Sequence, residues 1–421
     1  MTSDSVSSTP GSVPLPEGWR MVTFGEVARN VKNVIDRETC DLDRYIAGEH
    51  MKTDDLHIRK WGTINGDYLG PAFHCKFEKG QILYGSRRTY LRKVAIAPFD
   101  GICANTTFVI EPKGDAMIPE ILPFLMQSEG FNQYSIQHSK GSTNPYIIWR
   151  DLAAYTFPLP PIDEQRRIAK ILWAAEDVIV KNEAFVAEVE HYKQLMMRDL
   201  FSKGIGHEEF RRIKEAGSMP PGWRRMQIGS VSEVKGGIQK TKNRDPKRNP
   251  RRYLTVAHVQ RNYIDTDDPR YFELTDEELE AWRLLAGDVL VIEGNGNREL
   301  VGRSALFRGE IKDCVHQNHI IRVRPHRDSL VPEYLTYFLN SPTGRRSVNK
   351  QSMGTSGLFT LSVGRLKKTE VPLPLLPEQH QIASILSTID DTIAAARASV
   401  EASKALKMRL INQLLSVGDT V

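Results

Sequence analysis

The sequence repeats itself, and this internal repeat restricts the possible fold more than any other feature. The stretch from Pro16 to Arg20 recurs from Pro220 to Arg224, 204 residues later. From Pro158 onward, the second copy follows at an offset of 214 residues without a gap. Repetition over such a long period indicates two copies of one structural unit, with insertions between the matched stretches.

Each copy ends in a long helical pattern, in which mostly apolar residues recur every seven positions. Five such heptads favour a two-helix coiled coil over the ordinary core helices of a bundle. Prolines precede both patterns, while Gly204 and Gly418 follow them and are expected to end the helices. The spacing predicts antiparallel helices over 162–203 and 376–417, each roughly 60 Å long. Asn182, a polar residue at a core position, is expected to set their register.

The segments before the helices have a different pattern. Short apolar runs are interrupted by Gly, Pro and Asn, which is typical of strands in an irregular domain. Strands are predicted at 81–84, 94–97, 107–110, 288–292 and 320–323, with short helices at 118–127 and 331–340. The expected fold class is α+β: two irregular α/β domains in tandem, each followed by a long helix, with pseudo-twofold symmetry.

Composition limits the cellular setting and the partners. The formal net charge is +5 and the pI is near 8.8, which is compatible with an anionic partner. The four cysteines form no CxxC pair, so a disulfide framework or zinc ribbon is not expected and a reducing cytoplasm fits better. No run of 18 apolar residues occurs, so no membrane span is expected. Residues 1–13 are interpreted as a disordered leader, because they lack the apolar core of a signal peptide.

The motifs of a methyltransferase or a nucleotide hydrolase are incomplete. The loop Asn144-Pro145-Tyr146 lacks the second proline of a base-holding methyltransferase loop. The glycine turn Gly294–Gly296 has no further cofactor pattern, and the sequence contains no GxxxxGK[ST] loop. Neither methyl transfer nor ATP hydrolysis is therefore expected on this chain.

Two candidate metal sites also fail on inspection. Asp100 and Glu111-Pro112-Lys113 have the spacing of a nuclease metal site. However, Pro112 cannot donate to a sheet ladder, and the second copy has Arg324 in place of the acid. Cys314, His316 and His319 form an incomplete ligand set and are interpreted as a polar loop or strand edge. No metal site is predicted.

Basic loops in both copies are the stronger signal. Residues 235–252 carry eight Lys and Arg against one acid, Asp245. One charge run is often only a solvated surface, but similar loops in both halves favour DNA, whose phosphates attract Lys and Arg and whose base edges pair with Asn, Ser and Arg. Trp19 and Trp223 are predicted to anchor the two cores. The predicted DNA-binding residues are Arg87, Arg88, Tyr90, Lys140, Ser142, Thr143 and Asn144 in the first copy and Lys240, Lys242, Arg244, Arg248, Arg252, Asn295, Arg298, Asn318, Ser352 and Thr355 in the second.

Several motifs together resemble one family. They are the Pro-x-Gly-Trp openings at Pro16 and Pro220, the Pro-Leu-Pro…Glu-Gln-x-x-Ile-Ala boundaries at Pro158 and Pro372, and the stretch 44–50. The chain resembles the specificity subunit of type I restriction–modification systems over nearly its whole length. The resemblance implies two target-recognition domains, each of which reads one half of a split DNA sequence, on an antiparallel helical spacer. It also implies two modification subunits that bind S-adenosylmethionine and methylate adenine, and restriction subunits that use ATP and Mg²⁺.

The repeat and the resemblance together predict the domain organisation. It comprises a leader (1–13), target-recognition domain 1 (14–160), spacer helix 1 (161–204), a linker (205–219), target-recognition domain 2 (220–374) and spacer helix 2 (375–418). The chain itself is expected to be non-catalytic, without cofactor, and cytoplasmic. Two alternatives remain open. One is a stand-alone DNA-binding regulator, which needs no apolar surface beyond its own coiled coil. The other is the specificity subunit of a related system whose partner combines methylation and cleavage.

Overall fold

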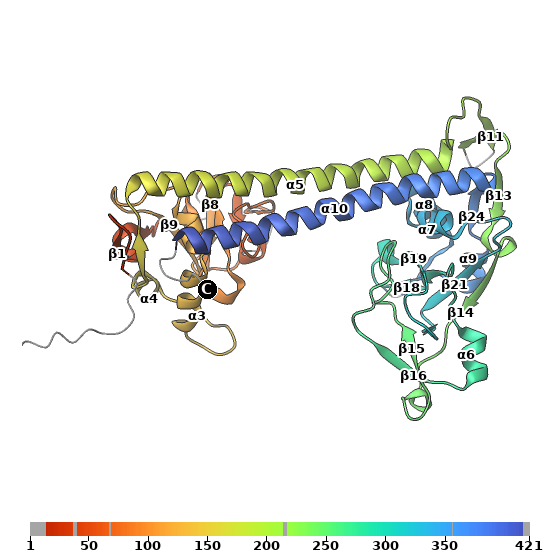
Figure 1. The fold of residues 1–421 in the computed structure, drawn as a ribbon. Coiled ribbons are helices and arrows are strands. Elements are labelled where there is room, and N and C mark those ends of the chain that lie inside the picture. The colour runs from red at the N-terminus through yellow and green to blue at the C-terminus, as the bar shows by residue number, and fades with distance from the viewer. Residues whose placement is uncertain (1–13, 37–39, 67–68, 214–216, 356, 416–421) are drawn as a thin grey trace, which may run out of the picture. The chain divides into compact units, whose positions relative to one another are not determined.

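The computed structural model describes residues 14–36, 40–66, 69–213, 217–355 and 357–415, so the predicted leader and Gly418 lie outside the described residues. The chain divides into two compact units, unit 1 (1–183 with 398–421) and unit 2 (184–397). Each unit holds one domain of strands and short helices, together with part of each long helix. These helices are α5 (Ile162–Lys203) and α10 (Leu376–Leu415) (Figure 1). Within the described residues, no helix is long and apolar enough to cross a membrane.

Domain 1 contains two four-stranded sheets. The first is antiparallel, in the order β2 (Ala28–Asn30), β9 (Thr107–Pro112), β6 (Ile82–Gly85) and β7 (Val94–Ile96). The second has the order β4 (Gly62–Thr63), β3 (Arg44–Ile46), β8 (Gly101–Ala104) and β5 (Phe73–Phe77), with β3 and β8 parallel. The helical elements are α1 (Phe24–Val27), η1 (Gly48–His50), η2 (Thr89–Leu91), α2 (Leu122–Gln127), α3 (Glu129–Gln137) and α4 (Trp149–Ala153).

Domain 2 repeats the first of these sheets as β14 (Ser232–Gly236), β21 (Ile320–Pro325), β17 (Val289–Ile292) and β19 (Ser304–Leu306). Two three-stranded sheets join it, one of β16 (Arg270–Glu273), β15 (Pro250–Leu254) and β20 (Val315–His316), the other of β18 (Gly294–Asn295), β23 (Leu358–Thr360) and β22 (Met353–Thr355). Its helical elements are η3 (Ile228–Ser230), η4 (Lys242–Arg244), α6 (Asp276–Trp282), η5 (Arg298–Leu300), α7 (Pro332–Asn340), α8 (Pro342–Gln351) and α9 (Val363–Lys367).

These elements confirm the predicted α+β class, because all five predicted strands and both short helices are present. The segment 205–219, predicted as a linker, contains a hairpin of β11 (Arg211–Ile213) and β12 (Gly217–Met219). Gly204 ends α5 in a left-handed conformation, with φ +69°, as expected of a glycine after a helix.

Each opening motif is joined to the start of a long helix. β1 (Arg20–Thr23) pairs antiparallel with β10 (Thr156–Leu159), and β13 (Arg224–Gln227) pairs in the same way with β24 (Glu370–Leu373). Trp223 is fully buried, and its Nε1 donates to Glu378 Oε2 at 3.0 Å. Trp19 is only half-buried against the domain 1 core, so the predicted anchor is weaker in the first copy.

A buried glutamine explains why the motif before each long helix recurs. Gln165 Oε1 accepts from the Ile118 amide at 3.0 Å, while its Nε2 donates to the Ala116 and Pro160 carbonyls. Gln379, 214 residues later, makes the same set with Val331, Ser329 and Pro374. Because both side chains are fully buried, the amide satisfies main-chain groups that would otherwise lack partners. The repeated Glu-Gln pair is therefore structural.

The two long helices run antiparallel within each unit. In unit 1, Lys407 Nζ lies 2.8 Å from Glu176 Oε2, and Asn182 Nδ2 donates to Ser399 Oγ at 3.3 Å. In unit 2, Lys193 pairs with Asp390 and Arg397 with Glu190. Lower numbers on α5 face higher numbers on α10 throughout, which confirms the predicted direction within each unit.

The two lysine–acid pairs are related by the sequence repeat. Lys193 and Lys407 are 214 residues apart, and so are Glu176 and Asp390. Each pair therefore joins the lysine of one copy to the acid of the other. Lys407 and Glu176 are both buried, as is Lys193. Since a buried charge without a partner is strongly unfavourable, the pairs select one register of the helices.

Candidate nucleic-acid interface

Two loops of domain 1 that are distant in sequence lie together. Arg88 donates from Nε and Nη2 to Asn144 Oδ1 at 2.9 and 2.7 Å. Arg87 and Lys140 each bridge to Tyr146 through the main chain. The loop after β6 and the loop after α3 therefore form one surface, called the domain 1 loop surface, which carries all seven residues predicted in the first copy.

Most of these side chains face solvent. Arg87, Arg88, Tyr90, Ser142, Thr143 and Asn144 are exposed. Lys140 pairs with Asp151 at 2.7 Å, and this contact lowers the pKa of Asp151. Arg92 has a structural role instead, because it binds Asp54, Glu129 and the Gln127 carbonyl and so holds the loop in place.

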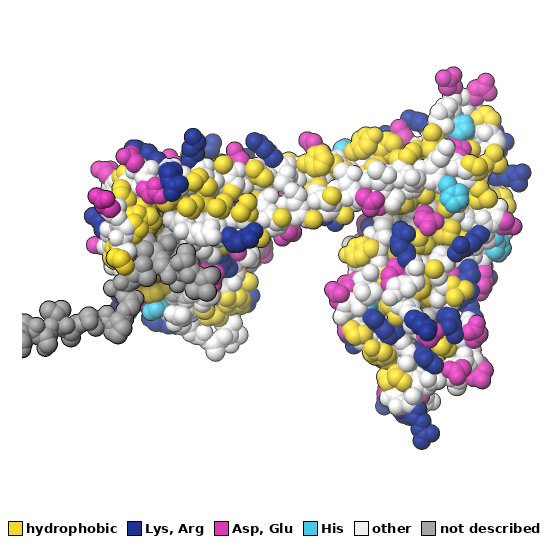
Figure 2. All heavy atoms as spheres, viewed as in Figure 1, with side chains coloured by type: hydrophobic (Ala, Val, Ile, Leu, Met, Phe, Trp, Pro, Cys, Tyr) yellow, Lys and Arg dark blue, Asp and Glu magenta, His cyan; other side chains and the backbone are white. Residues whose placement is uncertain are grey.

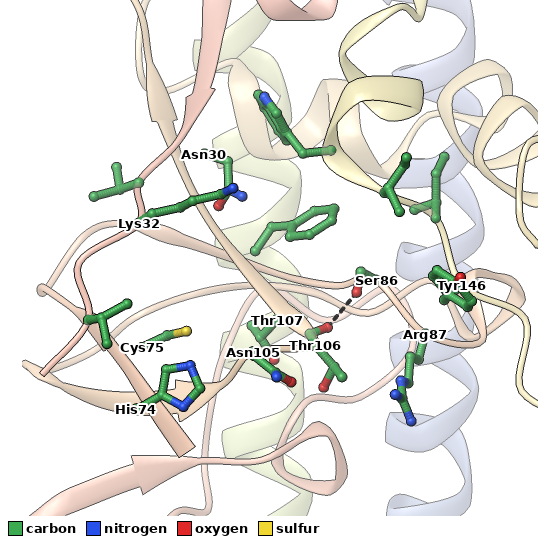
Figure 3. Close-up of a pocket in the computed structure, with 16 residues that line it drawn as sticks. Asn30, Lys32, His74, Cys75, Ser86, Arg87, Asn105, Thr106, Thr107 and Tyr146 are labelled. Atoms are coloured by element: carbon green, nitrogen blue, oxygen red, sulfur yellow. Dashed lines mark hydrogen bonds between the residues drawn. The ribbon is translucent and has the colours of Figure 1, made fainter. Parts of the chain in front are cut away.

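A pocket of about 520 Å³ opens beside this surface (Figure 3). Side chains from β2, β5, β6, the β8–β9 turn and the segment before α4 line it. Figure 3 shows Asn30 and Lys32 on one side and Arg87 and Tyr146 on the other. None of the described residues that line it is acidic. The sequence analysis named none of Asn30, Lys32 and Asn105; an Asn in a tight turn between two strands was the available signal.

The basic run of domain 2 is partly neutralised by acids from other elements. Arg244 pairs with Glu278 at 2.8 Å and Arg251 with Asp276 at 3.0 Å. Glu273 accepts from the amides of 247, 248 and 249, which lowers the pKa of Glu273. The ratio of eight basic residues to one acid therefore overstated the charge, because β16 and α6 supply acids that are distant in sequence. Figure 2 shows Lys and Arg beside Asp and Glu over this domain.

The predicted basic residues of this run differ in availability. Lys240, Lys242 and Arg248 are exposed. Arg252 is half-buried, and its Nη2 donates to the Thr266 carbonyl at 3.0 Å. A phosphate contact by Arg244 or Arg252 would compete with these internal partners, so the first three are the better candidates.

The other predicted residues of domain 2 are brought together by main-chain pairing. The Asn318 amide donates to the Ile238 carbonyl at 2.9 Å, which places it next to the start of the basic run. The Glu293 amide donates to the His319 carbonyl at 3.0 Å, and Asn295 then pairs with Phe359. These segments form one continuous rim, called the domain 2 rim.

Arg298 and Ser352 lie on the same rim. Arg298 Nη2 donates to the Asn349 carbonyl at 3.2 Å, and its Cζ lies 5.7 Å from the Phe359 ring centre. Ser352 Oγ also donates to the Asn349 carbonyl, at 3.1 Å. Thr355 belongs to β22, but its side chain lies outside the described part of the chain.

Three arginines that the sequence analysis missed hold the loop of Arg298. Arg345 Nη2 donates to the Arg298 carbonyl at 3.1 Å, and Arg261 Nη2 donates to the Glu299 carbonyl at 2.6 Å. Burial lowers the pKa of Arg345 and of Arg303, and the charge of Arg261 lowers both further. They are scattered through the sequence from 261 to 345, so no local pattern revealed them.

The residues considered as metal ligands have other environments. Asp100 accepts from the Lys79 amide at 2.8 Å, and Glu111 accepts from Arg29 Nε at 2.7 Å. His316 is fully buried, which lowers its pKa to about 3, whereas His319 is exposed. Among the described residues, the acids and histidines close enough to share an ion are Asp55, His57 and Glu176. Arg59 already pairs with Asp55 and Lys407 with Glu176, so cations occupy this cluster.

His57 gives this cluster a pH dependence. Its Nδ1 lies 3.6 Å from Asp55 Oδ1 and 3.2 Å from Glu176 Oε1, and these contacts raise the pKa of His57 to about 9 from 6.5. The folded pKa exceeds the unfolded one, so the stabilisation is complete below pH 6.5 and is lost as the pH rises through 9. We expect the urea midpoint of the wild type to approach that of His57→Gln over this range. Parallel curves from pH 6 to pH 10 would contradict this.

Comparison with known proteins identifies both copies with one domain type. A family model described as the type I restriction modification DNA specificity domain matches residues 16–190 and again 220–401. The type I restriction enzyme MjaVIII specificity subunit of Methanocaldococcus jannaschii is 23% identical, over 96% of this chain and 93% of that protein. The EcoKI specificity subunit of Escherichia coli is 28% identical, over 87% and 81%. A solved structure from work on complex assembly and conformational transition of a type I restriction–modification system has a TM-score of 0.62 at 23% identity, over 97% of this chain and all of that one, so the fold is shared.

Proposed function

The chain belongs to the type I restriction modification DNA specificity family, and from this premise we propose that it is the subunit that directs methyltransferase and endonuclease subunits to a DNA target in two parts. The observation that carries this function is the double match of the family model, once for each domain. Each domain reads one half-site. Because one base pair contributes only about 1–3 kcal/mol of discrimination, two readers on one chain add the specificity that a single small domain lacks.

An exposed apolar stripe on α5 favours a subunit of a complex over a stand-alone regulator. Phe185 and Tyr192 are seven residues apart and are 48% and 53% exposed, and Leu195 is 40% exposed. Figure 2 shows hydrophobic side chains along the long helices. A regulator that needed only its own coiled coil would not expose them, whereas a partner subunit would cover them. We assign this surface to two modification subunits, which would carry S-adenosylmethionine; restriction subunits would carry ATP and Mg²⁺, and the complex would act in the cytoplasm.

Mapping methylated adenines in cells with and without this gene, together with modification subunits, tests the function. We expect a split motif that disappears with the gene. Asn295→Ala is expected to cost about 1–3 kcal/mol at one base position of one half-site. Lys240→Ala or Arg248→Ala is expected to weaken binding to all sequences alike and to lower the salt slope by about one unit.

Arg225→Ala is the matched control for the basic run, because Arg225 is also an exposed arginine of domain 2 but pairs with Glu370 at 3.0 Å on β24. It should leave the salt slope unchanged. A relaxed base preference in both half-sites after Asn295→Ala would contradict independent reading by two domains. Methyl transfer from labelled S-adenosylmethionine by the isolated chain would contradict the non-catalytic assignment.

A further inference from the structure

The pocket beside the domain 1 loop surface has the chemistry of a nucleobase site. We propose that it receives one base of the domain 1 half-site, rotated out of the DNA stack. This inference rests on the proposed function, because it assumes that domain 1 binds DNA. It adds a specific ligand and a specific place to that function.

The walls of the pocket offer flat apolar contact. Phe108 and Trp149 are half-buried, with ring centres 6.0 Å apart and nearly perpendicular planes. Val34 stands at the opening with 67% of its surface exposed. Exposed apolar surface of this kind is unfavourable in water, and an aromatic face is a stacking partner that any base can use. The volume of about 520 Å³ is ample for a purine.

Polar side chains at the rim can pair with the edge of a base. Asn105 is exposed in the two-residue turn between β8 and β9. Asn30 Oδ1 accepts from the Val109 amide at 3.2 Å, which orients its side-chain amide group as a donor. Ser86 Oγ donates to the Thr106 carbonyl at 2.7 Å and holds the turn in place (Figure 3). Amide side chains are suited to base edges because they offer a donor and an acceptor side by side.

The charge of the pocket favours a nucleic acid over a protein segment. Lys32 and Arg87 line it, and the described lining contains no Asp or Glu. Arg87 also belongs to the domain 1 loop surface, so a strand bound there would lead directly to the opening. Phosphates on either side of an extruded nucleotide need such cations, whereas an apolar side chain of a partner protein does not. The nucleobase is therefore the better occupant.

A binding assay on the assembled methyltransferase tests the proposal. Once methylome mapping has defined the target, a series of duplexes is made, in each of which one base of the domain 1 half-site faces an abasic site. Extrusion no longer has to break a base pair at that position, so we expect binding about tenfold tighter for the position that enters the pocket. Val34→Asp and Asn105→Ala should abolish this gain. Asn33→Ala is the matched control, because Asn33 is an exposed neighbour that does not line the pocket.

The possible outcomes separate the two levels of the argument. If the wild-type complex does not select a split DNA target at all, the proposed function fails. If it selects the target but no position gains affinity in a way that Val34→Asp and Asn105→Ala remove, the pocket does not hold a base. Bases extruded by the methyltransferase subunits would show a gain that both variants leave unchanged. If the variants instead prevent assembly with the modification subunits, the pocket is a protein contact and the proposal is overturned.

Discussion

Replacement of Lys407 by methionine is expected to lower the free energy of unfolding by about 3 kcal/mol, the lower end of the effect of breaking a buried ion pair. Lys407 and Glu176 are almost fully buried, with side-chain exposures of 2% and 4%. Without the ammonium group, Glu176 keeps its charge in a site that water does not reach. Protonated His57 lies 3.2 Å from Glu176 and compensates in part, which is why the lower end applies near neutral pH.

The equivalent pair in unit 2 provides the internal control. Asp390, the partner of Lys193, has a side chain that is 33% exposed, and it also accepts from Tyr337 Oη at 2.8 Å. Lys193→Met should therefore cost less than Lys407→Met, because Asp390 retains water and a hydrogen bond. The double variant Glu176→Gln, Lys407→Met should recover much of the loss, since it leaves no buried charge.

Urea unfolding followed by circular dichroism measures these differences. Equal shifts for Lys407→Met and Lys193→Met would show that burial does not determine the cost. A double variant as unstable as the sum of its single variants would show that Glu176 and Lys407 do not interact. Either result would remove the ion pairs as the cause of the helix register.

Deletion of one heptad from each long helix is expected to shorten the gap between the two half-sites by about three base pairs. Seven residues span about 10 Å of helix, and B-DNA rises about 3.4 Å per base pair. Removal of 180–186 from α5 and 394–400 from α10 keeps the repeat offset of 214. It also leaves Glu176, Lys193, Asp390 and Lys407 in place, so both lysine–acid pairs can form in the shortened coil.

Methylome sequencing gives the result directly. The original motif should vanish, and the same two half-sites should reappear with the shorter gap. Removal of 180–186 from α5 alone is the control, because it misaligns one lysine–acid pair and should abolish methylation. If the paired deletion changed the bases that are read but kept the gap, the helices would not set the spacing.

The sequence by itself determined the repeat, the long helices and their antiparallel direction. These features depend on local periodicity and on residue identity at a constant offset, which are visible without coordinates. Lys193 and Lys407 were aligned in this way, but their partners were not, because an ion pair between two helices depends on register. Only the structure showed that each lysine meets the acid of the other copy.

The interface was decided by tertiary structure to a greater degree. Both loops of the domain 1 loop surface were recognised from composition, but the contact between Arg88 and Asn144 depends on how 56 residues fold between them. The pocket was not foreseen, because its lining comes from five separate segments. The basic run of domain 2 was overestimated for the same reason: Glu273 and Glu278 reach it only through the fold. Charge and pocket shape are sums over neighbours in space, and a sequence lists neighbours only along the chain.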